Sequence, residues 1–416
     1  MASNHEYWID IDEQGRLVIP PELSEHFGIQ PGTQILMKEG LKSLHLHRPV
    51  TQLAKVYVEP TSRCNLNCRT CIRNAWEEPQ GDMSARTFDQ LVESLKGLRS
   101  RPEVFFGGFG EPLQLPQIAE WVARLKPLAA KVELITNGLL LKESKSRALI
   151  EAGLDTLWIS VDGVTPESYA DVRIGAALPI VFKNLTRLAF LRNQTRLMPE
   201  IGISFVAMRR NIADLPALIQ MSSRLGVSRY KVTNVFPYTE EMCREMLYTR
   251  SVDRVDTLPS PLSPRVDLPR MDLDSVTQEA FVKTISNRNN VWINDMTLGQ
   301  ELRHCPFIDS GSLSVGWDGT ISPCLALLHP YNTYLNHKRR SVQRHIVGNL
   351  AEQDLKTIWN APDYVAFRKR VQEFDFSPCT CCGGCQMAEK NEEDCFGNPF
   401  PACGGCLWAQ GVIQCP

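Results

Sequence analysis

Six short runs of apolar, β-favouring residues recur between residues 55 and 236, and amphipathic segments separate them. The runs are KVYVEP, EVFFGG, KVELIT, TLWISV, IGISFVAM and RYKVTNVF, and the intervening segments include ARTFDQLVESLKGL, LPQIAEWVARLKPL and DLPALIQMSSRLGV. Strands that alternate with helices are typical of parallel sheets with right-handed crossovers. The sequence therefore predicts an α/β fold with an open or closed barrel, whose ligands lie at the C-terminal ends of the strands.

The overall composition limits the classes of function. A chain of 416 residues, 43% hydrophobic, can bury a large core in more than one domain. Its formal net charge of −2 gives no basis for non-specific binding to nucleic acid or to anionic membranes. Neither a membrane span nor a secretory signal is recognisable. We therefore expect a cytoplasmic protein without a membrane partner.

The chain has 14 cysteines, which is unusual for a cytoplasmic protein. Clustered cysteines in that compartment bind metal more often than they form disulfides. Three lie at residues 64–71 and ten lie from residue 305 onward. Cys243 has no partner at ligand spacing, and we expect it to be a small buried apolar side chain.

The segment CNLNCRTC places Cys64, Cys68 and Cys71 in one loop after the first predicted strand. Three thiolates so close together suit three corners of a [4Fe–4S] cluster, which leaves the fourth iron free for a substrate or cofactor. Zinc is the alternative, but a structural zinc site needs a fourth ligand, and no other Cys or His lies near this loop.

At these residues the sequence resembles the radical S-adenosylmethionine (SAM) superfamily, whose CxxxCxxC loop follows the first barrel strand. The resemblance implies a partial (β/α)6 barrel and a cluster that reductively cleaves SAM to a 5′-deoxyadenosyl radical. The position before the last cysteine is usually aromatic in the family and packs near adenine. Here it is Thr70, so the adenine contact is left open.

Further motifs at the ends of the predicted strands resemble the family's SAM site. The segment GGFGEP resembles the GGEP motif with one residue inserted, which implies a contact with the SAM amino group. The ends of the third and fourth strands are implied to bind the ribose, and an arginine to clamp the carboxylate, although a surface charge is the alternative. The ten predicted SAM residues are Gly107, Gly108, Gly110, Glu111, Pro112, Thr136, Asn137, Ser160, Asp162 and Arg173.

The C-terminal part resembles the SPASM domain, which carries auxiliary [4Fe–4S] clusters. A cysteine, a gap and then GTISPC match the opening pattern of that domain, but its usual CxxCx5CxxxC spacing is absent. The resemblance implies one or two auxiliary clusters, with one cluster and a structural zinc as the alternative. The predicted ligands are Cys305, Cys324, Cys379, Cys382, Cys385, Cys395, Cys403, Cys406 and Cys415, whereas Cys381 is expected to be a non-ligand.

Around these regions we expect four domains. Residues 1–50 contain a strand in GRLVIPPEL, a helix in SEHFGI and a strand in QILMKEG. This unit resembles half of the AbrB-like swapped-hairpin domain, which implies a homodimer, but its few basic residues argue against DNA binding. The barrel is expected at 51–250, a proline-rich linker at 251–290 and the SPASM domain at 291–416.

The hairpin unit, CRTCIRNAWEEPQGDM, GGFGEP and the CGGCLWAQGVIQCP tail together resemble one group of radical SAM maturases. This group is associated with tungsten-cofactor aldehyde ferredoxin oxidoreductases. The resemblance implies an enzyme that matures such an oxidoreductase or its cofactor, with a protein or peptide substrate and a low-potential donor such as ferredoxin. The alternatives are a thioether or carbon–carbon crosslink in a ribosomally made peptide, an iron–sulfur electron carrier, and a redox-sensing DNA regulator. The sequence identifies no catalytic residue that quenches the product radical.

Overall fold

The computed structural model describes residues 7–39, 44–194, 198–248, 265–269, 271–286, 290–293, 296–298, 304–380, 382 and 385–415. Its main sheet has the strand order β10-β9-β8-β7-β6-β5-β14-β15-β18. The first six strands in this order are mutually parallel, as the alternating pattern predicted. They are β5 (Lys55–Val58), β6 (Glu103–Phe106), β7 (Val132–Thr136), β8 (Thr156–Ser160), β9 (Glu200–Ala207) and β10 (Val227–Asn234).

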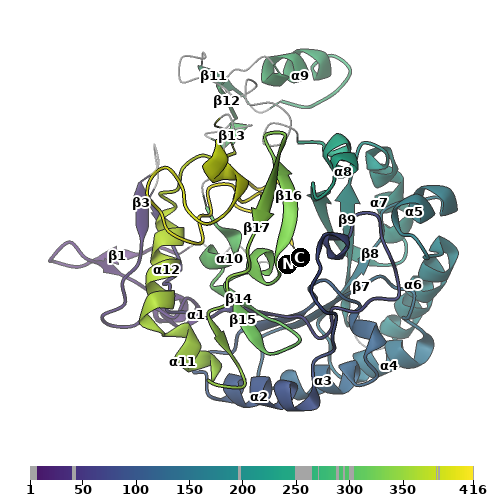
Figure 1. The fold of residues 1–416 in the computed structure, drawn as a ribbon, viewed down its shortest axis with the longest axis horizontal. Helices are drawn as coiled ribbons and strands as arrows, with labels where there is room; N and C mark the ends of the chain where they lie inside the picture. The colour runs from purple at the N-terminus through teal and green to yellow at the C-terminus, as the bar shows by residue number, and fades with distance from the viewer. Residues whose placement is uncertain are drawn as a thin grey trace.

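Helices cover the outer face of this curved sheet, and Figure 1 shows them as an arc along its rim. On α2 the apolar side chains recur at helical spacing, so Phe88 and Leu91 are fully buried. The ring of Phe88 stacks on that of Trp121 of α3, with the ring centroids 4.2 Å apart. The helices are α2 (Ala85–Lys96), α3 (Ile118–Leu125), α4 (Glu143–Glu151), α5 (Pro166–Val172), α6 (Leu178–Asn193) and α7 (Leu215–Ser223).

The C-terminal region continues the same sheet. Strand β14 (Ser312–Val315) pairs in parallel with β5, and β15 (Thr320–Ser322) and β18 (Gly348–Asn349) extend the sheet further. The sheet therefore crosses the boundary that we expected near residue 291. The remaining elements of this region are α10 (Pro306–Asp309), the hairpin of β16 (Tyr331–Leu335) and β17 (Lys338–Val342), α11 (Leu355–Trp359) and α12 (Pro362–Glu373).

The chain end lies beside the other edge of the barrel, next to β10. The Gln414 backbone N–H donates to Thr233 Oγ1 at 2.8 Å, and Asn234 Nδ2 donates to the Val412 carbonyl at 3.0 Å. Helix α8 (Glu240–Glu245) follows β10. Within the described residues, no helix combines the length and the apolar character that crossing a bilayer requires.

The N-terminal unit consists of β1 (Asp10–Ile11), β2 (Leu17–Val18), α1 (Pro21–His26), β3 (Met37–Glu39) and β4 (Leu44–Leu46). The helix begins three residues before the predicted SEHFGI segment, because proline fits the first helical position. The unit packs on the rest of the chain, since Gln52 Nε2 donates to the His26 carbonyl at 2.8 Å and Lys38 Nζ to the Gln372 carbonyl at 2.9 Å.

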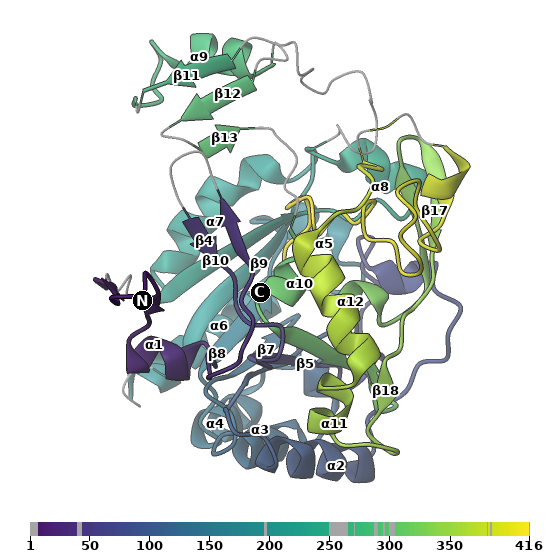
Figure 2. The same cartoon turned by 90° about the vertical axis from the view of Figure 1, so that its left-hand side faces the viewer.

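The segment 251–290, which we predicted as a linker, contains regular secondary structure in its second half. That half contains β11 (Arg265–Leu268) and α9 (Gln278–Ser286), and β11 forms a sheet with β12 (Asn290–Ile293) and β13 (Met296–Leu298). Figure 2 shows this small unit above the barrel. The prolines that suggested a linker gather before and just after β11, and a four-residue strand carries too little periodicity to be recognised. Residues 251–264 lie outside the described residues.

Candidate functional site

The loop after β5 holds Cys64, Cys68 and Cys71 in a curve that its own neighbours maintain. The Cys71 backbone N–H donates to the Cys68 carbonyl at 3.1 Å. Arg73 donates to the carbonyls of Ser62 and Leu66, both at 3.0 Å. Buried carbonyls with such partners are fixed in orientation, so the loop is organised by the protein itself.

The three thiols of this loop are half-buried, and they are close enough for their charges to act on one another. Burial raises the pKa of Cys68 to about 11; the Arg173 guanidinium opposes this shift, and the charges of Cys71 and Cys64 add to it. In the described part of the chain, no three His, Cys, Asp or Glu side chains are grouped as ligands of a single metal ion. In a cubane each thiolate binds a different iron. The donor set of this loop therefore fits three corners of a [4Fe–4S] cluster.

The GGFGEP segment packs directly on this cysteine loop. The Glu111 backbone N–H donates to the Arg63 carbonyl at 2.8 Å. A Cβ on Gly110 would lie 2.1 Å from the Thr61 carbonyl oxygen, which is backbone and cannot move aside easily. Gly108 has a φ of +103° and lies against Glu59. The glycines are thus needed for close approach between two loops as well as for any contact with a ligand.

Glu111 is buried and its carboxylate already accepts hydrogen bonds within the protein. It accepts from Thr136 Oγ1 and from the Asn137 backbone N–H, both at 2.7 Å, and from the Leu113 backbone N–H at 3.0 Å. Burial raises the pKa of Glu111, and these hydrogen bonds oppose the shift. Glu111 therefore fastens the glycine-rich loop to the end of β7, and its contact with the SAM amino group stays a prediction.

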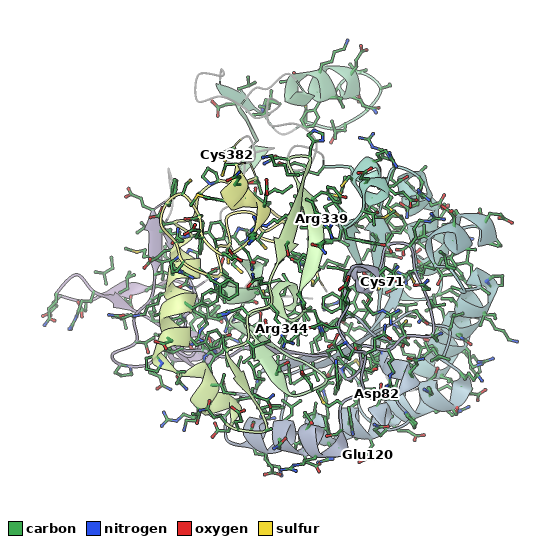
Figure 3. The ribbon with its side chains drawn as sticks, viewed as in Figure 1. Cys71, Asp82, Glu120, Arg339, Arg344 and Cys382 are labelled. Carbon is green, nitrogen blue, oxygen red and sulfur yellow. The ribbon has the colours of Figure 1, made fainter. Side chains whose placement is uncertain are left out.

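Replacing Glu111 by glutamine is expected to weaken SAM binding about tenfold, because an amide nitrogen would face backbone N–H donors and leave one of them unsatisfied. The matched control is Glu120→Gln on the outer face of α3, an exposed carboxylate whose position is labelled in Figure 3. Equilibrium dialysis of the anaerobic protein measures the SAM dissociation constant. Equal constants for both variants would show that Glu111 does not organise the site.

Asn137 connects the end of β7 to the cysteine loop. Its Nδ2 donates to Asn65 Oδ1 at 2.8 Å and lies 3.8 Å from Cys64 Sγ. We predicted this residue as a SAM contact, and the structure places it against the first cysteine. The preceding Thr136 contacts Glu111, so both residues hold the loops that surround the cysteines.

Asp162 and Arg173 form a buried ion pair, with Oδ2 and Nη2 2.7 Å apart. Asp162 is fully buried and also accepts from the Val206 backbone N–H at 2.8 Å, so it positions Arg173. Arg173 is only 8% exposed, which contradicts the alternative of a surface charge. Its Nε has no hydrogen-bond partner among the described residues. This donor lies beside Cys68 and could bind the carboxylate of SAM. The predicted contacts of Asp162 and of the half-buried Ser160 with the ribose stay predictions.

Four C-terminal cysteines line one cavity, which also contacts Tyr331, Arg340 and Trp408. They come from segments far apart in the sequence. Burial raises the pKa values of all four thiols, that of Cys305 to about 12, and the charges of neighbouring thiols add to the shift at Cys305, Cys324 and Cys403. Four converging thiols match the ligand number of one [4Fe–4S] cluster. The four are Cys305, Cys324, Cys403 and Cys406.

The structure places the other predicted cysteine ligands outside this cavity. Asn336 Nδ2 donates to the carbonyls of Cys379 and Cys382, at 2.8 and 3.0 Å, and so holds the segment that carries these two cysteines. Cys385 and Cys395 are exposed. Cys415 Sγ accepts from Trp408 Nε1 at 3.4 Å. In Figure 3 the labelled Cys382 lies among the C-terminal loops, away from Cys71. Their assignment to a cluster stays a prediction.

Two further cysteines were singled out from the sequence. Cys243 lies on α8 and is half-buried, so it is less covered than expected. Cys381, the predicted non-ligand, lies outside the described residues.

Replacing Cys324 by alanine is expected to remove about four irons per chain, because a cubane that loses one of its four thiolates is no longer held. Iron analysis of the reconstituted protein measures this loss, and Cys243→Ala serves as the control. Retention of all iron in the Cys324 variant would refute the four-cysteine group.

Four residues that shape the site were not predicted from the sequence, namely Glu59, Asn65, Arg73 and His329. Asn65 lies between two of the cysteines and Arg73 lies two residues after Cys71, so their position in the sequence could have indicated a role in the loop. His329 carries no such signal, since only the fold brings it to Glu59, 270 residues away along the chain, with its Nε2 2.9 Å from Glu59 Oε2.

Comparison with known proteins agrees with this geometry. The family model of the radical SAM superfamily matches residues 58–189, and that of the SPASM iron–sulfur cluster-binding domain matches residues 305–386. The solved structure of anSMEcpe with bound AdoMet has the same fold, with a TM-score of 0.51 and 17% identity, covering 87% of this chain and 93% of that chain. The chain therefore contains a radical SAM domain and a SPASM domain, and it is a radical SAM enzyme. Its cofactors are SAM, the [4Fe–4S] cluster of this superfamily and auxiliary iron–sulfur clusters.

Among curated proteins, the chain is 28% identical over 366 residues to the tungsten-containing aldehyde ferredoxin oxidoreductase cofactor-modifying protein of Pyrococcus furiosus. This match covers 87% of this chain and 96% of the relative. The probable GTP 3′,8-cyclase of Methanothermobacter thermautotrophicus is 26% identical, over 76% of this chain and 96% of its own length.

Proposed function

We propose that this radical SAM enzyme matures a tungsten-containing oxidoreductase or the cofactor of that enzyme. The observation that carries the proposal is the similarity to the Pyrococcus furiosus cofactor-modifying protein, because it spans the barrel and the SPASM domain together. When bound and reduced, the cluster supplies the electron that cleaves SAM to methionine and a 5′-deoxyadenosyl radical.

The chain's own residues provide the binding, the orientation and the exclusion of water. Cys64, Cys68 and Cys71 would hold the cluster in the loop that Arg73 organises. The buried Arg173 offers Nε to the SAM carboxylate, and Asp162 fixes its guanidinium. GGFGEP packs on the cysteine loop and would, together with that loop, shield the reacting atoms from water.

The proposal includes partners. The substrate is a protein or a protein-bound cofactor, the electron donor is a low-potential protein such as ferredoxin, and the location is cytoplasmic. The N-terminal unit, whose Ile11, Leu17 and Val18 are exposed, is the part proposed to form a homodimer. Its exposed apolar residues support that role.

The test combines the anaerobic, reconstituted enzyme with an aldehyde ferredoxin oxidoreductase produced in cells that lack the enzyme. We expect 5′-deoxyadenosine formation to rise when this protein is added, and mass spectrometry to show a changed cofactor. A SAM cleavage rate that the oxidoreductase does not alter, together with an unchanged cofactor, would refute the proposed target.

The second candidate is the modification of a ribosomally made peptide. The solved structure of anSMEcpe with AdoMet and the Cp18Cys peptide, with a TM-score of 0.50 and 17% identity, has the same fold. The same assay separates the candidates, because only a peptide substrate would stimulate SAM cleavage and acquire a mass change in the absence of the oxidoreductase.

A further inference from the structure

A histidine from the C-terminal domain lies between two carboxylates of the barrel. His329 Nε2 is 2.9 Å from Glu59 Oε2, and its Nδ1 is 2.9 Å from Glu78 Oε2. A neutral imidazole carries one proton, so one of these contacts would set a lone pair against a carboxylate. Both contacts are favourable only when the ring is protonated on both nitrogens, as an imidazolium.

The surroundings of His329 favour that charged form. Burial would lower the pKa of His329, but the hydrogen bonds and charges of Glu59 and Glu78 outweigh it and raise the pKa above the ordinary value. Trp76 stacks on the imidazole with the ring centroids 4.2 Å apart, and an indole face attracts a cation. Arg344 Nη1 lies 3.0 Å from Glu78 Oε1, so the four charged groups balance.

The network joins three segments that the rest of the site depends on. Glu59 follows β5 and accepts from the Phe109 backbone N–H of GGFGEP at 3.3 Å. Trp76 and Glu78 follow the cysteine loop, and His329 lies five residues after Cys324. Side-chain exposure rises from 0% at Glu59 through 9% at His329 and 22% at Glu78 to 47% at Arg344. The network thus runs from the glycine-rich loop to the surface, where Figure 3 labels Arg344.

We propose that His329 is a positioning residue: held as an imidazolium between Glu59 and Glu78, it ties the SPASM domain to the glycine-rich loop that binds SAM. This inference rests on the SAM site of the proposed function. Glu59 transmits the contact, because its other oxygen accepts from Phe109 and its side chain lies against Gly108. The SAM loop then has its binding geometry only when the C-terminal domain is docked and His329 is charged.

The pH dependence follows from the direction of the pKa shift. Because the pKa of His329 is raised in the folded protein, its contribution is fully present below the ordinary histidine value of 6.5. That contribution is lost as the pH rises through the raised pKa. The groups that face the imidazole are Glu59 and Glu78, with Arg344 beyond Glu78. SAM binding is therefore expected to weaken on the alkaline side.

The experiment measures the SAM dissociation constant of the anaerobic holoenzyme by equilibrium dialysis from about pH 6 to about pH 9, the range in which a perturbed histidine titrates. Glu78→Gln removes one of the two carboxylates that raise the pKa of His329, so SAM binding should begin to weaken at a lower pH than in the wild type and should be up to about tenfold weaker at pH 8. His329→Gln should bind SAM about tenfold more weakly than the wild type at about pH 6, and its binding should not weaken further as the pH rises. Glu77→Gln, an exposed neighbour, is the matched control and should follow the wild-type curve.

Thermal unfolding of each variant, followed at the same pH values, shows whether it is folded. Should His329→Gln not fold, Glu78→Gln carries the test alone, because Glu78 lies at the outer end of the network. Identical pH curves for folded Glu78→Gln and the wild type would overturn the inference, as would wild-type binding that is independent of pH. If the wild-type holoenzyme binds no SAM at any pH, the proposed SAM site fails first, and the inference fails with it.

Discussion

Replacing Cys64 by alanine is expected to abolish SAM cleavage and to remove about four irons per chain, since three thiolates are the only protein ligands of a SAM-binding cubane. Cys64 lies at the start of the organised loop, where Asn137 Nδ2 approaches its sulfur at 3.8 Å. The measurement is 5′-deoxyadenosine formation by the reduced, reconstituted variant, together with its iron content.

Two controls make this result specific. Cys243→Ala removes a thiol on α8 and should keep full iron and full turnover. Thermal unfolding of the Cys64 variant shows whether the barrel remains folded, as we expect from a substitution in a loop outside the core. Normal deoxyadenosine formation by Cys64→Ala would exclude the assigned cluster site.

Replacing Gly110 by alanine is expected to destabilise the protein by about 3 kcal/mol or more, because backbone overlap in a packed site is among the costliest single changes. The added Cβ would lie 2.1 Å from the Thr61 carbonyl oxygen and 2.7 Å from that of Arg63. The variant should also lose measurable SAM binding, since the glycine-rich loop must move away from the cysteine loop.

The matched control is Gly97→Ala at the end of α2. There the nearest atom to an added Cβ is the Ser94 carbonyl oxygen at 3.5 Å, an ordinary contact. Denaturant unfolding compares the free energies of the two variants with that of the wild type. A Gly110 variant as stable as the Gly97 variant, with unchanged SAM affinity, would show that the two loops do not pack as described.

Much of the barrel could be predicted from the sequence, because β5 to β9 are largely buried and consist of short apolar runs. All six predicted runs became β5 to β10 with small changes at their ends. The continuation of the sheet through β14 could not be predicted. Its pairing partner β5 lies more than 250 residues earlier, and no local pattern reports such a contact.

In the candidate site too, local motifs could be predicted from the sequence, whereas contacts between distant segments could not. The cysteine loop and GGFGEP were recognisable as motifs because each lies within a few consecutive residues. Glu111 and Asp162 were predicted to contact SAM. In the structure both carboxylates are buried and accept hydrogen bonds from other residues of the chain. The four cavity-lining cysteines were predicted as ligands, but their grouping in one cavity depends on how the chain folds, as does the contact of His329 with Glu59.

Anaerobic turnover tests most directly whether this protein cleaves SAM with its iron–sulfur cluster. The iron–sulfur clusters are reconstituted, iron is counted, the protein is reduced with dithionite, SAM is added, and 5′-deoxyadenosine and methionine are quantified. We expect both products in equal amounts, and about twelve irons per chain if three cubanes assemble. A protein that assembles its clusters but forms no deoxyadenosine, with or without an aldehyde ferredoxin oxidoreductase present, would contradict this expectation and favour an iron–sulfur electron carrier.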